Sequence, residues 1–165
     1  MLTIKENLDK LEALKKANPI WRRNYVYIAG PYSGRDAHGQ QGYMVIEQNI
    51  LNARAAMKEL VNHGYGVFCP HMHSAHFEVI APDVGIDYWY ELDIYFLRLC
   101  HALLRLPGHS SGSDKEVSLC KDLSISVYYS VEELVQGFPV FREPNSGFDG
   151  IFTRLMTGGL TKDSL

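Results

Sequence analysis

The sequence predicts one α/β domain whose parallel sheet is covered by helices on both faces. Short apolar runs alternate with longer amphipathic segments between residues 25 and 136, which is the pattern of right-handed βαβ units. The 165 residues suit one domain and would be cramped for two. With 46% hydrophobic and 21% charged residues, the composition excludes disordered, collagenous and coiled-coil proteins. We expect a flavodoxin-like or Rossmann-like sheet of about four to five strands.

The first expected element is an amphipathic leading helix. Thr3 and Glu6 form a capping box, apolar residues recur at helical spacing after them, and Pro19 ends the pattern. Residues 1–24 are therefore expected to be a helix and linker that precede the domain. After the domain the alternation fails and glycine and turn residues dominate. We expect residues 137–165 to form an extension that is mobile or contacts another subunit.

Within the domain, residues 25–136, the elements follow the period of the apolar side chains. Buried strands appear as runs of β-branched and aromatic residues bounded by glycine and proline, whereas helices repeat apolar residues three and four positions apart. Strands are expected at residues 25–29, 65–69, 101–106 and 125–129, and helices at residues 43–63, 87–99, 113–122 and 131–135.

Charge, hydropathy and cysteine content limit the classes of partner. The formal net charge of −3 gives no broad cationic field to hold a nucleic-acid polymer or a membrane surface. No stretch reaches the roughly 18 apolar residues of a membrane span. The three cysteines are odd in number and lack CxxC spacing. We therefore expect them to be reduced, in a cytoplasmic protein that is not exported.

The loops that follow the strands are the expected ligand site, because ligands bind outside the carboxyl ends of the strands in open parallel sheets. The loop before the third long helix is the most informative. Gly108, Ser110 and Gly112 put backbone N–H groups and a hydroxyl at a helix N-terminus, which favours an anion such as phosphate. A simpler interpretation is that Ser113 is the helix N-cap and Glu116 completes its capping box.

Several motifs together resemble a known family. They are YIAGPYSG at residues 27–34, GYGVFCPH at 64–71, LRLPGHSSGSDKE at 104–116 and VYYSVEEL at 127–134. Their order resembles the nucleoside 2-deoxyribosyltransferase-like superfamily, and most closely its small phage and bacterial members. The resemblance implies cleavage of the N-glycosidic bond of a nucleoside or nucleoside 5′-monophosphate. We expect no cofactor and no metal, because this chemistry needs only carboxylates and hydrogen bonds.

The resemblance also implies roles for individual residues. Glu116 matches the glutamate that attacks the anomeric carbon, and Asp93 matches an aspartate that helps to position sugar and base. Ser110 and Gly112 match residues of the loop that holds the 5′-phosphate. The loop that closes over sugar and phosphate matches Gly30, Pro31, Tyr32, Ser33 and Gly34.

Independent chemistry makes sense of the two carboxylates. Departure of a base leaves oxocarbenium character at the anomeric carbon, which a carboxylate stabilises and then bonds to. Glu116, near a helix N-terminus, is expected to stay ionised. Asp93 would orient the sugar or deliver a proton to the base, although a solvated helix residue is an equally good interpretation of its position.

A second cluster is histidine-rich. His71 and His73 in an extended segment would point to one side, with His76 close by in sequence. Such a pair without a third ligand at set spacing often arises by chance. We therefore expect no metal there and assign His71 to a loop that contacts base or sugar.

The expected function is hydrolysis of the base–sugar bond of a nucleoside 5′-monophosphate, because the serines at the helix start favour a phosphorylated substrate. The alternatives are a nucleoside 2-deoxyribosyltransferase and a non-catalytic module that senses a nucleotide. Asp114 and Ser118 stand where many relatives have glycine, which is the argument for the sensing module. The partner is thus a small nucleotide or nucleoside. The aromatic segment IDYWYELDIYFL at residues 86–97 predicts a homodimer or larger homo-oligomer.

Overall fold

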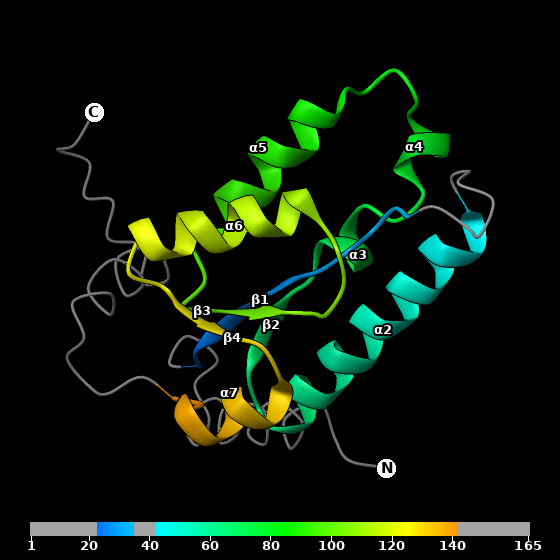
Figure 1. Ribbon diagram of the computed structural model, residues 1–165. Helices are drawn as coiled ribbons and strands as arrows, with labels where there is room; N and C mark the ends of the chain where they lie inside the picture. The colour runs from blue at the N-terminus through cyan, green and yellow to red at the C-terminus, as the bar shows by residue number, and fades with distance from the viewer. Residues whose placement is uncertain (1–22, 35–41, 142–165) are drawn as a thin grey trace, which may run out of the picture. The chain divides into compact units, whose positions relative to one another are not determined.

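The structure is a computed structural model that describes residues 23–34 and 42–141. Its core is a four-stranded parallel sheet with the strand order β2-β1-β3-β4. The strands are β1 (Tyr25–Ala29), β2 (Gly66–Phe68), β3 (Ala102–Arg105) and β4 (Ser126–Tyr128). Parallel pairing joins β1 to both β2 and β3, so the order of the strands reverses between β1 and β3. The predicted α/β class with a parallel sheet is confirmed (Figure 1).

Helices connect successive strands and cover both faces of the sheet. They are α2 (Tyr43–Asn62), α3 (Pro70–His73), α4 (Phe77–Ile80), α5 (Ile86–Leu97), α6 (Ser111–Asp122) and α7 (Val131–Gly137). In Figure 1, α5 and α6 lie on one side of the sheet, and α2 and α7 lie on the other. The short helices α3 and α4 were not predicted. Pro70 at the first position of α3 has its φ preset for a helix and lacks the N–H that would have no partner there.

The side chains of β1 show why the sheet has two cores. Val26 and Ile28 pack with α2 and α7, whereas Tyr27 and Ala29 pack with α5 and α6. All four side chains are buried, because side chains alternate between faces along a strand and helices cover both. A polar group on one of these positions therefore needs a partner inside the protein.

One helix begins earlier than predicted, with a consequence for the site. The N-cap of α6 is Ser110, whose Oγ accepts a hydrogen bond from the Ser113 backbone N–H at 3.2 Å. The capping box expected for Ser113 and Glu116 is therefore wrong. Glu116 lies in the second turn of α6, where a carboxylate has no capping role.

Residues Asn24–Val140 form a compact unit. In the described part of the chain, no helix combines the length and the apolar character needed to span a membrane. The predicted leading helix and most of the predicted extension at residues 137–165 lie outside the described residues.

Candidate active site

A strand and a helix meet through a hydrogen bond between two polar side chains. The hydroxyl of Tyr27, in the middle of β1, donates to Glu116 Oε1 on α6 at 2.5 Å. Tyr27 is fully buried, so its hydroxyl must find its acceptor inside the protein. Burial, together with the charges of Glu116 and Asp93, raises the pKa of Tyr27. The phenol therefore stays protonated and acts as a donor.

Glu116 and Asp93 form an electrostatically coupled pair. Burial raises the pKa of Glu116 to about 7, the hydrogen bond from Tyr27 opposes this rise, and the charge of Asp93 adds to it. Burial raises the pKa of Asp93, on α5, to about 6. The expectation that the helix N-terminus keeps Glu116 ionised is wrong, because desolvation is the largest effect. Because the two carboxylates interact, their titration belongs to the pair rather than to either residue alone.

Arg105 is the cation of this region. Its side chain, at the end of β3, lies on the same face of the sheet as Leu103, which packs with Tyr27. The residue is 8% exposed. It donates hydrogen bonds to the carbonyl oxygens of Leu106 and Gly108, the latter at 2.9 Å, and its charge lowers the pKa of Glu116. The guanidinium thus holds the loop before α6 and attracts the carboxylate.

The start of α6 lies against α5. A Cβ built on Gly112 would lie 2.5 Å from the hydroxyl oxygen of Tyr90, so only glycine fits unless Tyr90 moves. Burial raises the pKa of Tyr90, and the nearby charges of Glu116 and Asp93 raise it further. The Lys115 ammonium lies 5.2 Å from the centroid of the Tyr90 ring, within the range of a cation–π contact. Two tyrosines, two carboxylates and the α6 N-terminus therefore share one region.

The loop after β1 makes its contacts with α2, α3 and α4. The Tyr32 hydroxyl donates to Glu78 Oε2 at 2.9 Å and accepts from the His76 N–H at 2.8 Å. Its carbonyl accepts from Asn49 Nδ2 at 2.9 Å. Among the described contacts, none joins the Tyr32 side chain to Asp93 or Glu116. Tyr32 therefore ties the loop down, and Ser33 is the exposed residue beside it.

Other members of this loop approach the end of β3. A Cβ on Gly30 would lie 3.1 Å from two side-chain atoms of Leu106, and one on Gly108 would lie 2.8 Å from Pro31 Cγ. Gly108 has a φ of 113°, a conformation that glycine adopts readily. Gly34 accepts a backbone hydrogen bond from Gly42 at 3.2 Å. The loops after β1 and β3 are thus packed together.

His71 is buried and its imidazole faces Pro31. Its Nε2 lies 2.8 Å from the Pro31 carbonyl oxygen, so that nitrogen carries the proton and donates. Burial lowers the pKa of His71, and Nδ1 has no hydrogen-bond partner among the described residues. No set of three or more histidine, cysteine, aspartate or glutamate side chains in the described ranges is arranged to hold a metal ion. Through its hydrogen bond to Pro31, His71 supports the loop after β1.

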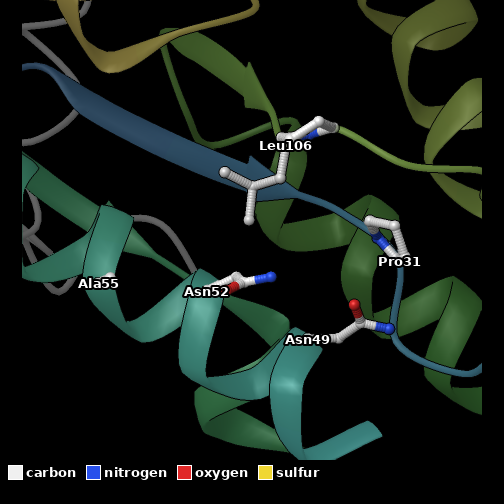
Figure 2. Close-up of a pocket in the computed structure, with 6 residues that line it drawn as sticks. Pro31, Asn49, Asn52, Ala55 and Leu106 are labelled. Carbon is white, nitrogen blue, oxygen red and sulfur yellow. The ribbon is translucent and has the colours of Figure 1, made fainter. Parts of the chain in front are cut away.

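A cavity of about 360 Å³ lies beside the ends of β1 and β3, on the α2 side. It is lined by Pro31, Asn49, Asn52, Ala55, Leu106 and Pro107. Figure 2 shows the Leu106 side chain directed toward α2, with the two asparagine amides below it. Neither Asp93 nor Glu116 lines the cavity. It opens where the strand order reverses, the usual ligand position in such folds.

Tyr27 and Arg105 were not predicted as site residues, although the sequence holds an indication of each. Tyr27 lies inside an apolar strand, and a buried phenol requires a partner. Arg105 is a charged residue at the end of the apolar strand ALLR, and a buried cation requires acceptors and a counter-charge.

Among the predicted site residues, the structure brings together Asp93, Gly112 and Glu116. Ser110 caps the helix that carries Glu116. The loop residues Gly30–Gly34 and His71 lie toward the α2 side instead.

No protein-family profile matches the chain, and no curated protein matches its sequence. One similar solved structure is described as the 2-deoxyribosyltransferase of the psychrotolerant bacterium Bacillus psychrosaccharolyticus. It is 11% identical, with a TM-score of 0.46, over 77% of this chain and 89% of that chain. The fold assignment rests on the strand order and the two helical layers described above.

Proposed function

We propose that the protein hydrolyses the N-glycosidic bond of a nucleoside 5′-monophosphate, with Glu116 as the nucleophile. The observation that carries this proposal is the hydrogen bond from Tyr27 to Glu116 Oε1, with Asp93 close enough to change the pKa of Glu116. Burying two carboxylates close together costs stability, because both are desolvated and their charges repel. Such a pair is therefore a feature of a reaction site rather than of a structural core.

In the proposed reaction the Glu116 carboxylate attacks the anomeric carbon of the sugar. The bond to the base breaks, its electron pair leaves with the base, and the base takes a proton from solvent. Water then attacks the anomeric carbon of the glycosyl ester, which releases the sugar phosphate and restores the carboxylate. The hydrogen bonds from the Tyr27 hydroxyl and the Ser113 side chain fix the orientation of the Glu116 carboxylate.

Asp93 is assigned the role of hydrogen-bond acceptor. Its charge raises the pKa of Glu116, and an ionised carboxylate accepts hydrogen bonds from sugar hydroxyls.

The start of α6 supports the choice of a phosphorylated substrate. The first N–H groups of a helix have no acceptor within the helix. Among the described hydrogen bonds, the Ser110 hydroxyl caps the Ser113 N–H and no other N–H group of this turn. The N–H groups of Ser111 and Gly112 precede it in the same turn, one to two turns before Glu116. A 5′-phosphate held there would set the anomeric carbon within the reach of a glutamate side chain.

The test is the release of free base from a panel of nucleoside 5′-monophosphates and the matching nucleosides, with and without an acceptor base. We expect release from monophosphates without an acceptor, and a loss of at least about 10³-fold in Glu116→Gln. Glutamine keeps the shape and the acceptor for Tyr27 but cannot attack. Asp122→Asn, at the exposed end of the same helix, serves as the control.

The same experiment separates the other functions. Base exchange that requires an acceptor would replace the hydrolase with a deoxyribosyltransferase, in which a second base resolves the same glycosyl ester. Binding of nucleotides without any base release would replace catalysis with sensing. Normal turnover in a folded Glu116→Gln protein would remove Glu116 from the mechanism.

A further inference from the structure

The Arg105 guanidinium has three polar partners. It donates to the carbonyl oxygens of Leu106 and Gly108 in the loop before α6. Its Nη2 also lies 3.1 Å from Asp114 Oδ1 in the first turn of α6. The guanidinium therefore lies between the two segments, loop and helix start, that flank the proposed phosphate position. Because the carbonyl bonds hold it, its charge stays there whatever its counter-charge is.

The two members of this ion pair differ sharply in exposure. The Arg105 side chain is 9% exposed and that of Asp114 is 64% exposed. A buried guanidinium needs a compensating anion, because an unpaired buried charge is costly. An exposed aspartate can rotate into water at little cost. The arginine is thus the permanent member of the pair, and the aspartate is the member that can be replaced.

We propose that Asp114 determines how strongly the site selects a phosphorylated sugar, because its carboxylate competes with the 5′-phosphate for the Arg105 guanidinium. This inference rests on the function proposed above. In the free protein Asp114 is the carboxylate in direct contact with Arg105. When a sugar phosphate binds, the phosphate oxygens take the place of the carboxylate, as a planar guanidinium permits. The energy of the phosphate contact is then reduced by the energy of the ion pair that it breaks.

The inference predicts an effect of opposite sign to the usual loss on mutation. Asp114→Asn keeps the size of the side chain but removes the charge that occupies Arg105 and repels the phosphate. We expect affinity for ribose 5-phosphate and 2-deoxyribose 5-phosphate to rise roughly tenfold. Affinity for the free sugars, which carry no charge, stays the same. The ratio between phosphorylated and free sugar is the quantity that Asp114 controls.

The experiment is calorimetric titration of the full chain with those two sugar phosphates and the two free sugars. The variants are wild type, Asp114→Asn and Asp122→Asn. Asp122 is an exposed carboxylate at the other end of α6, so its variant controls for net charge. An unchanged ratio in Asp114→Asn would overturn the inference. So would an equal rise in Asp122→Asn, since bulk charge alone would then explain it.

A second variant tests whether Asp114 acts through Arg105. In the Arg105→Gln background we expect Asp114→Asn to give no gain, because the guanidinium for which both anions compete is absent. A full tenfold gain in that background would overturn the competition. Melting curves check that each protein is folded. The gain in Asp114→Asn is measured without Arg105 variants, so the test does not depend on their folding.

Failure of this inference can be distinguished from failure of the proposed function. Cleavage of nucleotides with an unchanged sugar-phosphate ratio in Asp114→Asn rejects the inference alone. A raised ratio without cleavage of any nucleotide supports the competition and rejects hydrolysis.

Discussion

The Tyr27 hydroxyl on β1 donates to Glu116 Oε1 on α6 at 2.5 Å, and this contact links the central strand to the proposed nucleophile. The donor is anchored by the core, because Tyr27 is fully buried. The acceptor is a carboxylate whose pKa is raised to about 7. The hydrogen bond therefore has two roles: it fixes the orientation of Glu116 and it favours its ionised form.

Replacing Tyr27 with phenylalanine should change activity mainly through the pKa of Glu116. The lost hydrogen bond lowers that pKa in the wild type, so the variant should need a higher pH to ionise Glu116. We expect base release to fall roughly tenfold near pH 7 and to recover much of this loss near pH 9. A rate–pH profile measures it. Tyr65→Phe removes another hydroxyl that bonds to a carbonyl, that of Phe138, and should leave the profile unchanged.

Glu116→Gln should be more stable than the wild type at high pH. The folded-state pKa of Glu116, about 7, is above the model-compound value of 4.5. Its contribution to stability is thus present below pH 4.5 and is lost as pH rises through about 7. We expect equal melting temperatures near pH 4 and a gain of a few degrees for the variant near pH 8. A lower melting temperature at both pH values would contradict a desolvated carboxylate.

Asp93→Asn should move the acid limb of the rate–pH profile in the opposite direction from Tyr27→Phe. The charge of Asp93 raises the pKa of Glu116, so its removal should allow Glu116 to ionise at lower pH. The maximal rate should still fall, by roughly 10- to 100-fold, because an acceptor for the sugar is lost. Asp87→Asn changes an exposed carboxylate in the first turn of the same helix. An identical profile in Asp93→Asn and Asp87→Asn would exclude Asp93 from the site.

Gly112→Ala should damage the site by displacing Tyr90. The added methyl group would lie 2.5 Å from the Tyr90 hydroxyl oxygen but 3.4 Å from Cζ. We therefore expect a loss of stability and activity that Tyr90→Phe partly rescues, since phenylalanine lacks the clashing atom. Gly85→Ala, where nothing lies within 4 Å, should be tolerated. Thermal melting and base release of the double variant measure the rescue, and its absence would refute the contact.

The exposed apolar side chains of α5 predict self-association. Tyr88 is 56% exposed and Tyr95 is 63% exposed, and residues seven positions apart lie on the same face of a helix. Large contiguous apolar surfaces usually mark interfaces. We expect sedimentation at micromolar concentration to give a species of at least twice 18.7 kDa. Tyr88→Glu combined with Tyr95→Glu should dissociate it, whereas Tyr43→Glu, at an exposed position of α2, should not. A wild-type monomer would contradict the prediction.

The order and type of the main elements could be predicted from the amino-acid pattern alone. The residues of β1 were predicted to the residue, and the longer helices to within about two residues, because the period of apolar side chains reports which face is buried. The motifs around Asp93 and Glu116 also predicted these two residues as the candidate catalytic carboxylates. The α3 and α4 helices were missed because a four-residue helix is too short to show a period.

The surroundings of each carboxylate, in contrast, follow from contacts between distant segments of the chain. Ser110 rather than Ser113 caps α6, and the choice depends on the loop after β3, which packs against Pro31. The contact between Tyr27 and Glu116 joins residues 89 positions apart. Burial of Glu116, which raises its pKa, comes from the close packing of α5, α6 and the sheet. A linear pattern reports periodicity along the chain, whereas desolvation and hydrogen bonding depend on distances between segments that only folding brings together.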